Sequence, residues 1–190
     1  MKNIAIFASG EGTNAQKIIN YFSRSESIRV ALVVSNKPNA NVLNRAKDAG
    51  VPTLLIDRQT FYNSNQTIEQ LNLAKIDFIV LAGFLWLIPE SLVKAFPNKI
   101  INIHPALLPK FGGKGMYGMI VHEAVIEAKE KKSGITIHFV NEKYDEGKII
   151  SQHSCKIDEH DTAELLAQKI HHLEYEFFPK AIEDVVGKMG

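Results

Sequence analysis

Short apolar runs alternate with helical patterns along the first half of the chain. The runs have the length and composition of strands buried on both faces, and the residues between them have helical spacing. Strand followed by helix followed by strand, with short connections, requires right-handed crossovers and predicts a parallel sheet between layers of helices. The predicted strands are Ile4–Ala8, Ile28–Ser35, Pro52–Ile56, Phe78–Ala82 and Ile100–Ile103, and the predicted helices are Asn14–Tyr21, Asn41–Ala49, Thr67–Ala74 and Glu90–Phe96.

The last third of the chain has a different pattern. Two strand-like runs, Ile135–Val140 and Lys148–Lys156, are joined by a connection of hairpin length, which indicates an antiparallel element. A possible capping box begins at Asp161 and predicts a helix to about Phe178, where Pro179 kinks or breaks it. There is no repeat or linker in the sequence. We therefore expect a single domain over residues 1–190: a three-layer α/β fold, mostly parallel, with an antiparallel strand near its C-terminal end.

Charge and cysteine content exclude several classes of protein. The 22 basic and 21 acidic residues are interspersed, so no charged surface for nucleic acid or a membrane is expected. The single Cys155 cannot form an intramolecular disulfide, and the histidines lack metal-ligand spacing, so we expect no metal. The longest apolar run, Phe78–Ile88, is shorter than the ~20 residues of a membrane helix. These features predict a soluble, cytoplasmic protein.

A glycine-rich turn, Ser9–Ala15, joins the first predicted strand to the first predicted helix. It fits the G-x-G-x-x-A pattern, in which backbone N–H groups at a helix N-terminus bind a phosphate. A dinucleotide site also needs an acidic residue after the second strand, where this chain has Asn36 and Lys37. We predict a site for a single phosphomonoester, to which Thr13 and Asn14 add side-chain donors. The alternative is a tight turn that binds nothing.

Two polar residues interrupt the apolar run IINIHPALLP. Asn102 and His104 are two residues apart, so both belong on one face of a strand end, where ligands of parallel sheets bind. An amide donor beside a side chain that titrates near neutrality could stabilise an oxyanion and move a proton. Alternatively, both side chains only form hydrogen bonds with backbone groups of the loop that follows.

Two later features could complete such a site. Asp145 lies in an acidic loop after a strand, and a carboxylate near His104 would raise the pKa of that histidine. Asp145 alone would be an ordinary turn residue. The apolar run that contains Gly83 continues from a strand into a loop, and its side chains could line a slot for a flat ring or fold under the core.

Taken together and in order, these segments resemble the folate-dependent formyltransferases, in particular the phosphoribosylglycinamide formyltransferases of purine synthesis. The matching residues are Ser9–Asn14, Ala82–Phe84, Asn102–Pro109 and the Asp145 loop, and the resemblance covers nearly the whole chain. It implies a formyltransferase-like fold. It also implies transfer of the formyl group of 10-formyltetrahydrofolate, a co-substrate, to the amine of 5-phosphoribosylglycinamide.

The resemblance assigns roles to residues at both ends of the expected site. Gly12, Thr13 and Asn14 would hold the substrate phosphate, and Glu174 would contact its ribose. The pterin pocket would be lined, largely through backbone groups, by Leu85, Trp86, Leu87 and Ile88.

The catalytic roles fall to three residues. Asn102 would face the formyl group, His104 would be the general acid, and Asp145 would raise the pKa of His104. The expected partners are small molecules only, with the protein a monomer or homodimer.

Three segments depart from the family pattern. Trp86 stands where several relatives carry arginine, which suggests stacking in place of a charge contact, and Ser64 lies near the position of another folate-side arginine. The glycine-rich stretch Phe111–Gly118 could be a lid or an ordered series of turns.

Two other functions fit parts of the pattern. A formyltetrahydrofolate hydrolase would use the same three residues with water as acceptor. Such enzymes usually have an extra N-terminal domain, and a first strand at Ile4 counts against one. A non-catalytic nucleotide-binding domain would leave the Asn102, His104 and Asp145 set unexplained.

Overall fold

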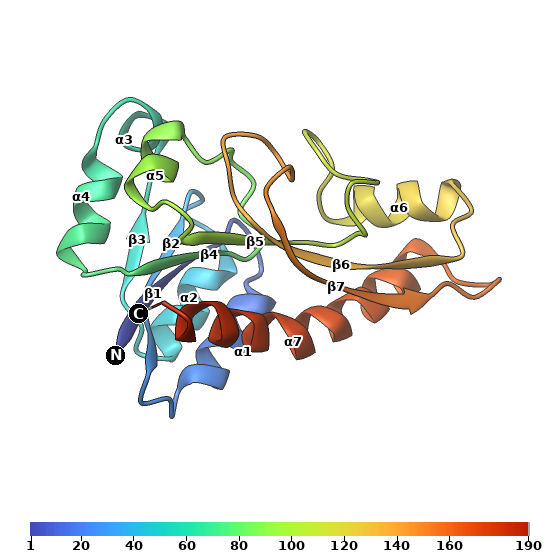
Figure 1. Ribbon diagram of the computed structural model, residues 1–190, viewed down its shortest axis with the longest axis horizontal. Coiled ribbons are helices and arrows are strands. Elements are labelled where there is room, and N and C mark those ends of the chain that lie inside the picture. Colours follow the sequence, from blue (N-terminus) through green and yellow to red (C-terminus); the bar gives the residue numbers. More distant parts are fainter. Residues whose placement is uncertain (190) are drawn as a thin grey trace.

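The computed structural model describes residues 1–189 and contains one seven-stranded sheet in the order β3-β2-β1-β4-β5-β6-β7 (Figure 1). The first five strands in this order, β3, β2, β1, β4 and β5, pair in parallel. Strand β6 runs antiparallel to β5, and β7 runs antiparallel to β6. The prediction of a mostly parallel sheet with an antiparallel C-terminal element is confirmed. The strands are β1 Lys2–Phe7, β2 Ile28–Ser35, β3 Thr53–Leu55, β4 Phe78–Leu81, β5 Ile100–His104, β6 Lys132–Phe139 and β7 Ile149–Lys156.

Helices cover both faces of the sheet and form three layers with it (Figure 1). Alternate residues of β1 belong to different cores: Ile4 and Ile6 pack with α1, α2 and α7, whereas Ala5 and Phe7 pack with α3, α4 and α5. This explains why consecutive residues of the central strands are apolar, as in Ile4–Phe7 of β1 and Phe78–Leu81 of β4. The helices are α1 Thr13–Phe22, α2 Asn41–Asp48, α3 Arg58–Tyr62, α4 Gln66–Leu73, α5 Glu90–Ala95, α6 Met119–Glu127 and α7 Ala163–Gly187.

Helix α7 differs from the prediction at both ends. Its N-cap is Thr162, whose hydroxyl accepts a hydrogen bond from the Leu165 N–H, one residue later than expected. The expected end near Phe178 was wrong, because α7 continues through Pro179 to Gly187. Proline removes one helical hydrogen bond, but the turns beyond it bury Ile182 and Val186 in the core. The apolar burial outweighs the lost bond.

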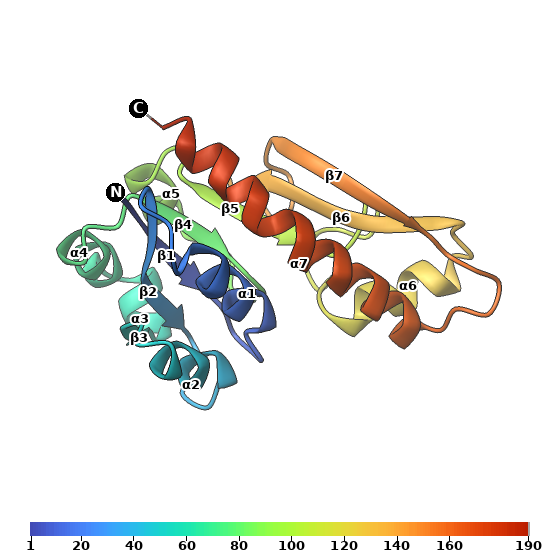
Figure 2. The ribbon, with the colours of Figure 1, turned by 90° about the horizontal axis from the view of Figure 1, so that it is seen from below.

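Two helices were not predicted. Helix α3 is only five residues long, too short for a periodic pattern, and a capping box between Asp57 and Thr60 defines its start. Helix α6 has apolar residues around most of its circumference, so it lacks an amphipathic period. It packs against α7, as Figure 2 shows from below the sheet. Within residues 1–189, no helix has both the length and the apolar character required to cross a membrane.

The sheet topology determines where a ligand can bind. The chain leaves β1 toward β2 on one side and later returns to β4 on the other, so the β1 and β4 ends form a topological switch point. The loops that follow these strands are joined there by a hydrogen bond from the Ser9 N–H to the Gly83 carbonyl, 3.0 Å long. The glycine loop and the apolar loop after β4 therefore lie side by side.

Candidate functional site

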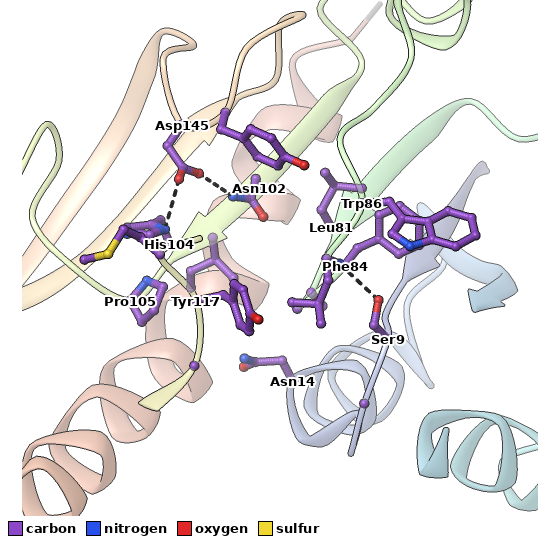
Figure 3. Close-up of a pocket in the computed structure, with 18 of the residues that line it drawn as sticks. Ser9, Asn14, Leu81, Phe84, Trp86, Asn102, His104, Pro105, Tyr117 and Asp145 are labelled. Carbon is purple, nitrogen blue, oxygen red and sulfur yellow. Dashed lines mark hydrogen bonds and ion pairs between the residues drawn. The ribbon is translucent and has the colours of Figure 1, made fainter. Parts of the chain in front are cut away.

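One pocket of about 790 Å³ lies at the carboxyl ends of β1, β4 and β5. Figure 3 shows Asn14, Phe84, Asn102 and His104 converging on this space from different elements. Every residue selected from the sequence lines it: Gly12, Thr13, Asn14, Leu85, Trp86, Leu87, Ile88, Asn102, His104, Asp145 and Glu174. The fold thus brings together residues that are far apart in the chain, while their individual roles remain predictions.

The glycine-loop end of the pocket consists of Gly12–Asn14 together with Glu174. Gly12 is the N-cap of α1 and has a φ of 71°, in the left-handed region that favours glycine. A Cβ atom on Gly12 would lie 2.5 Å from the side chain of Val42 in α2, so this glycine also permits close packing of the loop. The N–H groups of the first turn of α1 have no helical partners and are available to a phosphate.

Asn14 and Glu174 contact each other across this end. The Asn14 side-chain amide donates to Glu174 Oε2 at 2.9 Å, which joins α1 to α7. Glu174 is buried, and this burial raises the pKa of its carboxyl to about 7, although the bond from Asn14 acts in the opposite direction. Near neutral pH this carboxyl therefore exchanges between its protonated and ionised forms.

The second group of residues surrounds the end of β5. His104 is 3% exposed, its Nδ1 lies 3.5 Å from Asp145 Oδ2, and its Nε2 lies 2.7 Å from the Phe111 carbonyl oxygen. Asn102 Nδ2 lies 3.4 Å from the other carboxylate oxygen, Oδ1 (Figure 3). As predicted, Asn102 and His104 share one face of the strand, and that face meets Asp145.

The pKa of His104 differs from the expectation. Burial lowers it below its ordinary value of 6.5, and this effect outweighs the Asp145 carboxylate and the Phe111 carbonyl, which both raise it. The carboxylate acts in the predicted direction, but the net shift is downward. In the protein without ligands, His104 is therefore mainly neutral at pH 7.

Asp145 is held as a carboxylate by its surroundings. Burial alone would raise its pKa, but the adjacent His138 side chain, the charge of His104 when that ring is protonated and the N–H of Gly113 together lower it. The Gly113 N–H donates to Asp145 Oδ2 at 2.9 Å, which connects the glycine-rich loop to the cluster. The residue has a φ of 56°, a conformation that aspartate tolerates better than most side chains.

His138 belongs to this cluster and was missed in the sequence. It pairs with Asn102 across β5 and β6, with 3.1 Å between its Nε2 and Asn102 Nδ2. Its Nδ1 lies 2.8 Å from the Phe139 carbonyl oxygen, an acceptor, so Nδ1 carries the proton and Nε2 accepts from Asn102 in the neutral ring. One signal existed: Thr136 and His138 alternate in an apolar strand, as Asn102 and His104 do.

The orientation of the Asn102 amide follows from these contacts. Its N–H groups face His138 and Asp145, whereas the reverse orientation would place its oxygen against the Asp145 carboxylate. The bond to Asp145 is long, so a stronger acceptor in the pocket could replace it at little cost.

The apolar end of the pocket is formed by Leu85–Ile88. Leu85 is partly exposed in the pocket, and its N–H donates to the Ser9 hydroxyl at 3.0 Å. The Trp86 ring is supported from outside by Tyr62 and by the Arg58 guanidinium, which lies 5.2 Å from the ring centroid. The Tyr62 hydroxyl donates to the Leu87 carbonyl at 3.0 Å. Helix α3 therefore fixes the shape of this loop.

Comparisons with known proteins agree with one another. A model of the formyl transferase family matches residues 2–182. Phosphoribosylglycinamide formyltransferase of Bacillus subtilis is 39% identical and is aligned over 98% of this chain and 96% of its own length. The chloroplastic enzyme of that name from Arabidopsis thaliana is 42% identical, and the match covers 95% of this chain but only 64% of that protein.

Solved structures show the same similarity. The crystal structure of phosphoribosylglycinamide formyltransferase from Bacillus halodurans matches with a TM-score of 0.88 and 38% identity, over 100% of this chain and 97% of that one. The structure with the same name from Anaplasma phagocytophilum matches with a TM-score of 0.90 and 32% identity, over 98% and 87% of the two chains.

Proposed function

Because the chain belongs to the formyl transferase family, we propose that it transfers the formyl group of 10-formyltetrahydrofolate to the amine of 5-phosphoribosylglycinamide. The observation that carries this proposal is the position of Asn102, His104 and Asp145 in one pocket, together with a phosphate-binding type of loop and an apolar slot. A phosphorylated amine and a flat folate ring can then meet at the three polar residues.

The glycine-loop end suits the phosphoribosyl part of the acceptor. A phosphate accepts hydrogen bonds from the free N–H groups of α1, assisted by Thr13, while Glu174 faces the ribose. Lys37 also lines the pocket near this loop and contributes positive charge. The apolar end takes the pterin ring, whose polar edge can bond to backbone groups of Leu85–Ile88.

The reaction forms one bond and breaks another. The substrate amine attacks the formyl carbon, the bond from that carbon to N10 of the folate breaks, and one proton moves from the amine to N10. Negative charge develops on the formyl oxygen in between, and Asn102 and His104 donate hydrogen bonds to it, for which His104 Nε2 gives up its bond to the Phe111 carbonyl. Asn102 exchanges its long bond to Asp145 for this stronger one.

Asp145 and the oxyanion act together on His104. Burial keeps the ring mainly neutral before the reaction, but a second negative charge beside it raises its pKa as the oxyanion forms. His104 thereby becomes protonated as the oxyanion forms, and it can pass a proton to N10, the leaving nitrogen of the folate. The ionised Asp145 stabilises the protonated ring throughout.

We further infer that small molecules are the only ligands needed and that 10-formyltetrahydrofolate is consumed as a co-substrate. The proposal includes a cytoplasmic location, because both ligands are multiply charged metabolites that do not cross membranes unaided. It allows a monomer or a homodimer, since all the named residues come from one chain.

A spectrophotometric assay tests the proposal. Purified protein is given 10-formyl folate with and without 5-phosphoribosylglycinamide, and release of the deformylated folate is followed. We expect release only when the amine is present. Equal release without the amine would identify a hydrolase, and no release in either mixture would favour a non-catalytic binding protein.

A further inference from the structure

His122 is a buried histidine that neither the fold nor the reaction described above uses. It lies on α6 and is only 3% exposed, yet it lines the same pocket as Asn14 and Glu174, and nearby His171 belongs to α7, one turn before Glu174. Within residues 1–189 its Nδ1 is buried and has no hydrogen-bond partner. A buried polar atom without a partner costs about 1–3 kcal/mol, so a histidine here is expected to offset that cost through its other nitrogen, Nε2.

The two ring nitrogens of His122 have different surroundings. Nδ1 is shielded from solvent, so Nε2 is the nitrogen with access to the pocket. An N–H group left buried without an acceptor is rarer than an unpaired acceptor, which places the proton on Nε2. His122 therefore presents an N–H donor to the pocket.

The charge state of His122 supports this assignment. Burial, with smaller contributions from the nearby His171 and His104, lowers its pKa to about 4. The ring is neutral throughout the physiological range, so it cannot act as a charged partner of the phosphate. A neutral donor of this kind suits a hydroxyl group.

The neighbouring Glu174 supplies the complementary group. It lies on α7, against which α6 packs, and its carboxylate is an acceptor when ionised. A donor and an acceptor on adjacent helices match two neighbouring hydroxyl groups, one of which accepts and one of which donates. We propose that His122 Nε2 donates to one ribose hydroxyl of the acceptor substrate while Glu174 accepts from the adjacent one.

This assignment makes His122 a residue that selects ribose, and it rests on the proposed function. Two substitutions separate the ring nitrogens, because a glutamine amide nitrogen reaches about as far as Nε2, whereas that of asparagine reaches only as far as Nδ1. His122→Gln should keep KM for 5-phosphoribosylglycinamide within about threefold of wild type, whereas His122→Asn should raise it about tenfold, the value of one hydrogen bond. In both variants kcat should change by less than about threefold, because no bond to the reacting atoms is lost.

Substrate analogues provide the decisive measurement. For analogues that lack the 2- or the 3-hydroxyl, one of the two should be bound equally by wild type and His122→Asn, since the hydroxyl that His122 contacts is missing. The matched control is His172→Asn on the exposed face of α7, outside the pocket, which should change neither constant. Thermal unfolding confirms that each variant is folded.

Three outcomes would overturn the proposal. In the first, His122→Gln raises KM as much as His122→Asn does. In the second, wild type and His122→Asn differ in affinity for both analogues as much as they do for 5-phosphoribosylglycinamide, and in the third, kcat falls while KM stays unchanged. Calorimetric titration of wild-type protein with 5-phosphoribosylglycinamide separates these from failure of the proposed function. If wild type neither binds nor formylates this compound, the function itself is wrong.

Discussion

The glycine-loop end and the apolar end of the pocket are built from different chemical groups. The glycine-loop end offers backbone N–H groups and the polar side chains of Asn14 and Glu174, which line the pocket there. At the apolar end, Leu85–Ile88 form a wall that stacks on α3 through Trp86 and Tyr62. The first end is suited to a small charged group with hydroxyls, and the second to a flat ring.

The two ends are also connected to the rest of the protein in different ways. Gly12 cannot carry a side chain without meeting Val42 of α2, which is itself fully buried, so substitutions in the glycine loop disturb the fold as well as the ligand. The apolar wall packs on the buried Phe61 and also on two exposed side chains of α3, Arg58 and Tyr62, so substitutions of these two should affect the ligand more than the fold. Asn102 and His104, the proposed reacting groups at the end of β5, line the same pocket as both ends.

The largest effect is expected at His104 and Asp145, which belong to neither end. Asp145→Asn keeps the size of the side chain but removes its charge, and His104→Ala removes the ring. Each should lower kcat by about 10²–10⁴, typical of acid–base groups, and the double variant should be little worse than either one. Rates measured at saturating concentrations of both substrates test this. Losses that multiply in the double variant would show that the two residues act independently.

The pH profile of the same variant sharpens this prediction. Activity that needs a protonated His104 is lost as pH rises through the pKa of that residue. Removing the Asp145 charge removes a contribution that raises this pKa, so the high-pH limb of kcat should move to lower pH in Asp145→Asn. An unchanged limb would mean that another group governs it.

A stability difference is expected at the glycine-loop end. The folded protein holds the Glu174 proton up to about pH 7, whereas the unfolded chain releases it near the ordinary value of 4.5. Between these values the free energy of unfolding therefore falls as pH rises, by about 3 kcal/mol in total. Glu174→Gln cannot ionise and should gain stability relative to wild type over this range. Urea unfolding of both proteins at pH 4.5, 6 and 8 measures their free energies of unfolding. A difference between the two proteins that does not change with pH would contradict the effect of burial on the Glu174 pKa.

Paired substitutions test whether the two ends are separate. Asn14→Ala should raise KM for 5-phosphoribosylglycinamide and Trp86→Ala should raise KM for the formyl folate, each by about tenfold, the effect of 1.4 kcal/mol. In each variant the KM for the other substrate should change little. Initial rates with one substrate varied and the other saturating provide both values. Equal changes in both constants would show that the ends are coupled.

The smallest effect is expected from the support beneath the apolar wall. Tyr62→Phe removes only the hydroxyl that donates to the Leu87 carbonyl, and this bond is exposed to solvent. We expect KM for the formyl folate to rise by about two- to fivefold, with kcat unchanged, as for one exposed hydrogen bond. Tyr21→Phe, which removes another exposed tyrosine hydroxyl bond far from the pocket, is the matched control.

Several features of this protein were determined by the sequence alone. The apolar runs predicted the parallel strands because such strands are buried on both faces, and the spacing of Asn102 and His104 placed both on one side of a strand end. The glycine pattern predicted the loop before α1, because its backbone conformation depends on local residues. These are all effects of neighbours within a few positions in the chain.

Which distant groups come into contact depends on the packing of the whole fold. The contacts of His138 with Asn102 and of Asn14 with Glu174 depend on strand pairing and helix packing, which no local pattern records. The downward shift in the pKa of His104 and the upward shift for Glu174 arise from burial, which is a property of the whole fold. The sequence therefore specified the chemical groups of the site, and packing specified their partners and charge states, because electrostatic energy depends on the surroundings in three dimensions.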